Sequence, residues 1–353
     1  MRFGFSIPTL TAFPRSTENY EGGTRIRYER TYEICQLAEE LGYDFGTIGQ
    51  HRFSPEVIDA SAPLMVLAAL AAKTKTLKLC TNITLIATHP VIDFAEQVAT
   101  VDEISGGRLI LTVALGYRPY EYESVGLNFK ERVGRLEEGV EILRRAWRGG
   151  PVHFDGKYLK VPGVVITPPI TQEGGPPIWI GADVEKAISR AARIADGWVA
   201  VNTETITSLT PKIARFKREA AEHGNKGTVA IVRKVGVGKT RQQVEDEWFP
   251  DILKAFQTYV HHNVVFENKE FEEVLRSGKS MRLNDFPDDL FVAGTPGECI
   301  DQIRDIQRKT GCEYIICDFG RAAHGAPYDR LREMIELFGR EVIPAFSPAE
   351  AGV

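Results

Sequence analysis

The chain lacks the features that mark membrane, nucleic-acid-binding and secreted proteins. No apolar run approaches the roughly 20 residues needed to span a bilayer, so no membrane protein is predicted. The formal net charge is only −5 over 353 residues, which leaves no basic field to attract nucleic acid or an acidic membrane. The first residues, MRFGFSIPTLTAF, have no charged-then-apolar secretion signal. The five cysteines form no C-x-x-C pair, as expected of buried thiols in a reducing cytosol, and we expect a cytoplasmic protein.

Nucleotide-binding and metal-binding signatures are also missing. No G-x-G-x-x-G follows the first predicted strand, which argues against an open dinucleotide-binding sheet. The stretch GVGKT at 236–240 is preceded by Arg233 where a phosphate-binding loop needs glycine, so we interpret it as a strand that runs into a loop. His261 and His262 have no cysteine or carboxylate pattern around them, and no metal site is predicted.

What the sequence does contain is a regular alternation of strand-like and helix-like segments. In the first predicted helix, Ile34, Leu37, Ala38 and Leu41 fall on one face, and Gly42 ends it. Eight strands are expected, most of them followed by a helix, at 2–8, 43–49, 76–86, 108–116, 176–182, 196–201, 228–238 and 312–319. Alternating units predict a parallel sheet, and eight of them favour a closed (β/α)8 TIM barrel, so residues 1–353 are predicted to form a single α/β domain.

Two stretches interrupt this alternation. Residues 150–176 carry a turn signal at Asp155-Gly156 and are predicted to form a β-hairpin with a proline-rich return. Residues 240–290 are mixed, charged and aromatic. We expect them to form a mobile, lid-like insertion, because residues 268–289 have little continuous apolar surface to bury. Its apolar side chains, which are expected to close over an apolar substrate, are Phe271, Leu275, Met281 and Phe286.

In a TIM barrel the chemistry lies where strands end and helices begin. The predicted rim is therefore made of residues 50–53, 82–90, 115–122, 181–184, 200–203, 236–290 and 318–326. His51 ends the second strand on this rim. A histidine there can act as an acid or base near neutral pH, or it can be a simple hydrogen-bonded rim residue.

The turn WIGADVEK at 179–186 is a candidate anion seat. Small residues, Gly181 and Ala182, precede a helix start at Asp183 and Val184, and free N–H groups at a helix start attract phosphate. The alternative is that the Asp183 carboxylate only caps the helix, where its charge would repel a phosphate that it faced.

Several segments, in order along the chain, resemble the bacterial-luciferase-like flavin monooxygenases. The most specific is ATHPVIDFAEQVATVDEISGGRLILTVALGY at 87–117. ELGYDFGTIGQHRF at 40–53, PPIWIGADVEKAISRAARIADGW at 176–198 and ELFGREVIPAF at 336–346 are similar to other segments of that family.

The resemblance implies a TIM barrel that binds reduced FMN (FMNH2) at the carboxyl ends of its strands. It implies that O2 and a small organic substrate react there, that the protein is a homodimer, and that a separate NAD(P)H-dependent flavin reductase supplies the cofactor. His51 matches the family's catalytic base. The positions that match cofactor-binding positions are Asn82 and Ile83 in a bulge that often holds a non-proline cis peptide, Gly116, Tyr117 and Arg118 after strand four, and Gly181, Ala182, Asp183 and Val184 at the phosphate.

The chain departs from the family pattern at residues 50–53, the end of the second strand, which we call the lip. Gln50 and Arg52 flank His51 where the family often has a glutamate and a second histidine, and Leu115 stands where some members place a phosphate-binding arginine. The missing acid lowers the expected basicity of the histidine. Two alternatives stay open: a deazaflavin-dependent dehydrogenase of the same superfamily, and a flavin-binding protein without catalysis.

Overall fold

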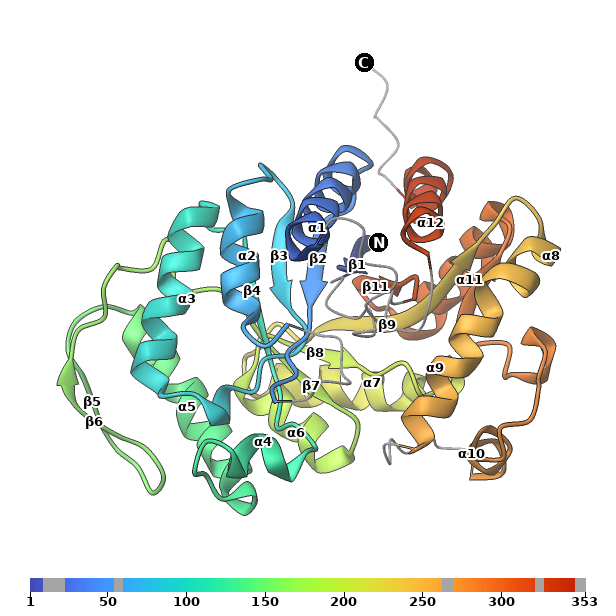
Figure 1. Cartoon of the computed structure of the whole chain (residues 1–353). Helices are drawn as coiled ribbons and strands as arrows, with labels where there is room; N and C mark the ends of the chain where they lie inside the picture. Colours follow the sequence, from blue (N-terminus) through green and yellow to red (C-terminus); the bar gives the residue numbers. More distant parts are fainter. Residues whose placement is uncertain (9–22, 54–59, 262–268, 321–326, 347–353) are drawn as a thin grey trace.

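The computed structural model describes residues 1–8, 23–53, 60–261, 269–320 and 327–346, and within them eight parallel strands close into a barrel (Figure 1). The barrel strands are β1 (Arg2–Ser6), β2 (Phe45–Ile48), β3 (Lys78–Thr81), β4 (Leu109–Val113), β7 (Ile178–Ala182), β8 (Gly197–Ala200), β9 (Thr228–Val237) and β11 (Tyr314–Asp318). They pair in the order β11-β1-β2-β3-β4-β7-β8-β9, and β9 pairs again with β11. The predicted (β/α)8 barrel is confirmed.

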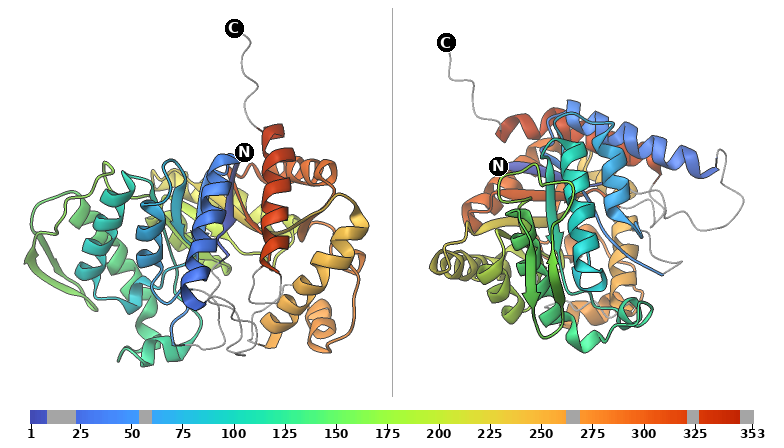
Figure 2. Two further views of the ribbon diagram at one scale, coloured as in Figure 1. Left: turned by 45° about the horizontal axis from the view of Figure 1, so that its top comes forward. Right: turned by 90° about the vertical axis from the view of Figure 1, so that its left-hand side faces the viewer.

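Helices surround this barrel on its outside (Figures 1 and 2). They are α1 (Gly23–Glu40), α2 (Pro63–Ala71), α3 (Val91–Ser105), α5 (Arg132–Trp147), α6 (Glu185–Ile194), α7 (Ile206–Glu222), α11 (Pro296–Thr310) and α12 (Tyr328–Glu341). Each buries its apolar side against the strands, as Leu136, Val140 and Leu143 of α5 do. None of the helices in the described part of the chain has the length and apolar character that crossing a membrane would require.

The interior of the barrel is filled by a second core, distinct from the one beneath the helices. Its buried members are Phe45, Cys80, Ile110, Trp179, Val199, Ala230 and Ile316. Because side chains alternate along a strand, the residues two positions beyond Trp179 and Ile316 also point inward, at the mouth. These residues are Gly181 and Asp318, and Lys234 lies on the inward face of β9 with Ala230.

The predicted hairpin is confirmed at β5 (Val152–Asp155) and β6 (Lys160–Val164), which pair antiparallel. Its turn is held by Glu138 of α5, whose carboxylate accepts backbone N–H groups of Lys157, Tyr158 and Leu159. The hairpin lies on the opposite side of the molecule from α9 (Phe249–His261) and α10 (Lys269–Arg276) (Figures 1 and 2).

The insertion at 240–290 differs from the prediction. Its described parts form α8 (Arg241–Gln243), a π-helical turn (Val244–Trp248), α9 and α10, and β10 follows at Phe291–Gly294; residues 262–268 lie outside the described residues. Here Phe271, Leu275 and Phe286 are buried. The Phe286 ring lies 4.7 Å from the ring of Phe271 and 5.1 Å from that of Phe291.

The expectation of little apolar surface to bury is therefore wrong. A cluster of aromatic rings holds the segment against β10 and α9, because each ring removes a large apolar area from water. In this arrangement the buried side chains cannot also close over a substrate. Met281, which was expected to close with them, is partly buried against the same core.

Candidate active site

The carboxyl end of β3 carries a bulge. The backbone N–H of Asn82 donates to the carbonyl of Ile48 at 2.6 Å, and the N–H of Gln50 donates to the carbonyl of Ile83 at 3.1 Å. Pairing with β4 resumes only at Thr84, opposite Val113. The peptide bond between Asn82 and Ile83 is cis, as the resemblance implied. The contact of this bulge with a cofactor stays a prediction.

The tip of β7 packs directly against this bulge. A β-carbon on Gly181 would lie 2.5 Å from Cδ1 of Ile83 and 3.7 Å from the β-carbon of Ala114. Only glycine fits this close approach without displacing the isoleucine. Two of the predicted cofactor positions, Ile83 and Gly181, are thus brought together at the mouth of the barrel.

The predicted phosphate seat follows at the start of α6. Val184 is the residue before the helix, and within the described part of the chain no side chain caps its first turn. The Asp183 carboxylate accepts the N–H of Val184, at 2.8 Å, and both residues are exposed. The carbonyl of Ala182 is fixed by the indole N–H of Trp198, at 2.8 Å. Asp183 therefore lies before the helix and bonds to the N–H of the N-cap residue, Val184.

Gln50, the first residue of the lip, is buried and ties two backbone segments together. Its amide oxygen accepts the N–H of Leu85 at 2.9 Å, and its amide nitrogen donates to the carbonyl of Ser61 at 3.2 Å. The same amide lies 3.3 Å from Nε2 of His89. Burial, followed by the nearby positive charge of Arg52, lowers the pKa of His89 to about 4. Gln50 therefore has a structural role at the place where the family often carries an acid.

His51 has an acidic neighbour that the sequence did not reveal. Nδ1 of His51 lies 3.8 Å from Oε1 of Glu121, whose side chain is 1% exposed, against 19% for the histidine. The same oxygen accepts the backbone N–H of Arg52 at 3.0 Å. Glu121 belongs to α4 (Pro119–Glu123), a short helix after β4. Residues 115–122 were expected on the rim, but nothing in PYEYE distinguishes Glu121 from Glu123, which is exposed.

The residues after β4 line the lip beside His51. Gly116 has a φ of 68°, and a β-carbon there would lie 2.9 Å from Leu85. The ring of Tyr117 meets the His51 imidazole edge to face with 6.2 Å between centroids. The Arg118 guanidinium lies 5.1 Å from the centre of the Tyr117 ring and donates to the Tyr120 hydroxyl at 2.9 Å. Tyr117 is half exposed, so this group forms an aromatic and cationic wall of the mouth.

A buried ion pair at the mouth was also missed. Nζ of Lys234 lies 2.6 Å from Oδ2 of Asp318, with side-chain exposures of 0% and 3%. The other Asp318 oxygen accepts the N–H of Gly320 at 3.1 Å. Side-chain alternation along β9 and β11 places both charged residues on the inward face of the barrel. A lysine and an aspartate so far apart in sequence, however, carry no pattern that would pair them.

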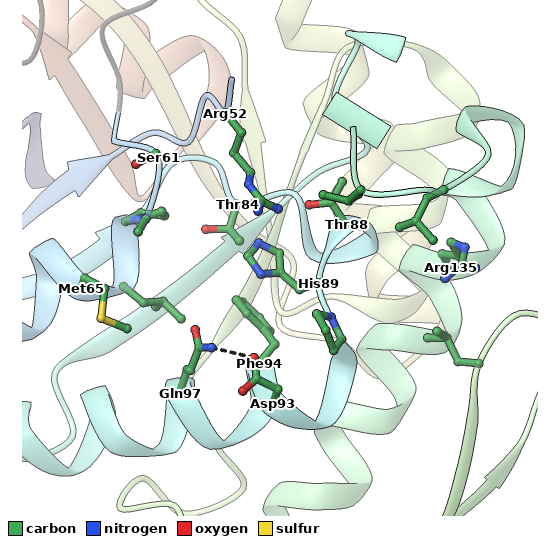
Figure 3. A pocket seen from close by; sticks show the side chains of 17 residues that line it. Arg52, Ser61, Met65, Thr84, Thr88, His89, Asp93, Phe94, Gln97 and Arg135 are labelled. Carbon is green, nitrogen blue, oxygen red and sulfur yellow. Dashed lines mark hydrogen bonds between the residues drawn. The ribbon is translucent and has the colours of Figure 1, made fainter. Parts of the chain in front are cut away.

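The hollow shown in Figure 3 lies beside the mouth and does not contain His51. It has a volume of about 630 Å³ and lies next to α2 and α3. Arg52, Thr84 and His89 converge in it, and Gln97 donates to Asp93 at 2.7 Å (Figure 3). Arg52 lines this hollow and His51 does not. The two neighbouring side chains therefore point into different spaces.

Comparison with known proteins gives a consistent family. The sequence model of the luciferase-like monooxygenase family matches residues 1–314. An F420-dependent glucose-6-phosphate dehydrogenase from Nocardia farcinica is 27% identical over 88% of this chain and 92% of its own. A 5,10-methylenetetrahydromethanopterin reductase from Archaeoglobus fulgidus is 27% identical over 90% of this chain and 95% of its own. The solved structure of the monooxygenase RslO1 from Streptomyces bottropensis superposes with a TM-score of 0.80 at 22% identity, over 98% of this chain and 100% of the other.

Proposed function

Because the chain belongs to the luciferase-like monooxygenase family, whose members are oxidoreductases, we propose that it is an FMN-dependent monooxygenase. It uses reduced FMN (FMNH2) and O2 to oxygenate a small organic substrate. The observation that carries the proposal is that three predicted positions, Ile83, Gly181 and His51, lie together at one barrel mouth. Gly181 packs on Ile83, and Gln50, the neighbour of His51, is hydrogen-bonded to the carbonyl of Ile83.

The mouth fits a flat, phosphate-bearing cofactor. The missing β-carbon of Gly181 and the bulge at 82–83 leave a smooth wall against which a ring system can stack. The first turn of α6 offers backbone N–H groups to a phosphate, and Arg118 can add a positive charge from the adjacent strand end. When bound there, reduced flavin supplies the electrons that activate O2.

The side chains of the chain itself have separate tasks in this proposal. His51 accepts or returns a proton at its ring nitrogen, as general bases near neutral pH do. Tyr117 and the bulge at 82–83 border the mouth and keep water away from the reacting atoms. Lys234, paired with Asp318 on the inward face, places a compensated positive charge at the floor of the mouth.

The test is His51→Ala. Turnover should fall by about 10²- to 10⁴-fold, the usual contribution of a general base, while FMN affinity measured by fluorescence titration changes little. His223→Ala is the matched control, since His223 is an exposed imidazole at the end of α7. Turnover of His51→Ala equal to that of the control would make the lip purely structural.

A second candidate function is F420-dependent oxidoreduction by hydride transfer, without O2. The name of the Nocardia farcinica relative, an F420-dependent dehydrogenase, favours it, and the Archaeoglobus fulgidus relative is named a reductase and not a monooxygenase. Titration with FMN and with F420, followed by turnover under air and under nitrogen, separates the two. Tight FMN binding with substrate-dependent O2 consumption supports the monooxygenase. Tight F420 binding with turnover that is indifferent to O2 replaces it, and binding of either cofactor without turnover indicates a non-catalytic flavin-binding protein.

The proposal includes the setting of the enzyme. We expect a cytoplasmic homodimer that receives its reduced cofactor from a separate NAD(P)H-dependent flavin reductase. Sedimentation velocity at micromolar concentration measures the oligomeric state. Turnover with and without an added reductase, at fixed NADH and FMN, measures the dependence on a partner; a chain that oxidises NADH by itself would need none.

A further inference from the structure

Among the described residues, the buried carboxylate of Glu121 meets two nitrogen atoms, both from neighbouring residues of the chain. Its side chain is 1% exposed, and burying a carboxylate without hydrogen bonds or an opposite charge is costly. The contacts at Oε1 are the N–H of Arg52, at 3.0 Å, and Nδ1 of His51, at 3.8 Å. Both belong to the lip, so the helix α4 delivers an acid to the segment where the family often has one of its own and this chain has Gln50.

Nδ1 of the His51 ring is buried and lies 3.8 Å from Oε1 of this acid. A neutral imidazole carries one proton, and the acceptor nearest to one nitrogen decides which nitrogen holds it. A distance of 3.8 Å is longer than a hydrogen bond, but a buried carboxylate charge at this distance still favours the tautomer whose N–H faces it. The Tyr117 ring, edge-on to the imidazole at 6.2 Å, limits rotation of the ring away from Glu121.

We propose that Glu121 is a positioning residue that keeps the proton of His51 on Nδ1, so that Nε2 is the nitrogen that accepts a proton at the barrel mouth. The inference rests on the proposed role of His51 as the base. It also accounts for Gln50, because the amide at the expected acid position is occupied by Leu85 and Ser61 and the acid comes from another strand end. The bond from Arg52 fixes the carboxylate, since a charge-assisted hydrogen bond to a backbone N–H is strong and directional.

The alternative is that Glu121 only anchors the lip backbone through Arg52. NMR of the full chain with ¹⁵N-labelled histidine separates the two, because long-range ¹H–¹⁵N correlations show which ring nitrogen carries the proton. The chain has seven histidines, and the signals of His51 are assigned by their loss in His51→Gln. The spectra are recorded without cofactor, at a pH where the imidazole is neutral.

We expect the proton on Nδ1 in the wild type, and a shift toward the Nε2-protonated form in Glu121→Leu. Glu123→Gln, an exposed acid on the same short helix, should leave the spectrum unchanged. A proton on Nε2 in the wild type overturns the proposal with no variant needed. A proton that stays on Nδ1 in Glu121→Leu also overturns it.

Kinetics of Glu121→Gln provide a second readout in a variant that keeps an oxygen for the Arg52 N–H. We expect kcat to fall by about 10- to 100-fold, the range seen when the carboxylate partner of a metal-bound histidine is removed, with KM and cofactor affinity nearly unchanged. Unchanged kcat in this variant would refute the positioning role. Because the tautomer is read without cofactor or turnover, failure of the inference and failure of the proposed function are distinguishable.

Discussion

The buried pair of Lys234 and Asp318 makes a sharp stability prediction. The two charged atoms are 2.6 Å apart, and the side chains are 0% and 3% exposed. Replacing Asp318 by asparagine leaves an ammonium group with no compensating charge from this partner. Breaking a buried pair on one side typically costs about 3 to 5 kcal/mol of unfolding free energy. We therefore expect D318N to lose about that much.

The double variant Lys234→Met/Asp318→Leu should lose less than either single variant, D318N or Lys234→Met, because apolar side chains of similar size avoid the desolvation of both charges. Urea unfolding followed by circular dichroism measures all three. Asp305→Asn is the control, since Asp305 pairs with Lys309 at 2.7 Å on the surface of α11 and exposed pairs contribute less than about 1 kcal/mol. If D318N unfolded like this control, or if the losses of the single variants simply added in the double variant, the two buried charges would not be coupled.

Three further predictions concern the contact between Gly181 and Ile83, the buried His89, and the insertion. In Gly181→Ala the new β-carbon displaces Ile83 at a cost of about 1 to 3 kcal/mol, so the dissociation constant for FMN should rise by about tenfold or more. Gly297→Ala is the control, because its added methyl group would meet no atom of the described chain within 4 Å. Equal FMN affinities in the two variants would refute the contact of Gly181 and Ile83 with the cofactor. The pKa of His89 is lowered to about 4, so at a pH between that value and the ordinary pKa of histidine the unfolded chain binds a proton that the folded chain does not. The unfolding free energy should therefore fall by at most about 3 kcal/mol as the pH drops from 7 to 4. H89Q should reduce this pH dependence when urea unfolding is repeated across that range. Phe286→Ala should cost about 3 to 5 kcal/mol in urea unfolding, whereas a loss below about 1 kcal/mol would mean that the aromatic cluster does not hold the insertion in place.

The repeating part of the fold could be predicted from sequence because its signals are local. The apolar positions of α5, Leu136, Val140 and Leu143, are all buried as their helical spacing requires. The hairpin at 152–164 followed from one turn signal. In each case residues close in the chain determine the structure.

The features that were missed depend on contacts between distant residues. Glu121 meets Arg52 69 residues away, and Lys234 meets Asp318 84 residues away. Neither pair has a spacing that a single sequence can reveal. The insertion was misjudged for a related reason: its Phe271 and Phe286 are separated by charged residues, so they are adjacent only after the chain has folded back on itself.

β9 has a consequence for how accurately the molecule is assembled. Its residue Lys234 pairs with Asp318 of β11 inside the barrel and also with Phe291 of β10 outside it. One continuous strand is therefore part of two pairing systems. A slip by a single residue would turn every side chain of a strand to the opposite face, and here it would separate Lys234 from Asp318 and misplace the aromatic cluster at the same time. The insertion and the barrel thus each constrain the alignment of the other, and an error in either destabilises both.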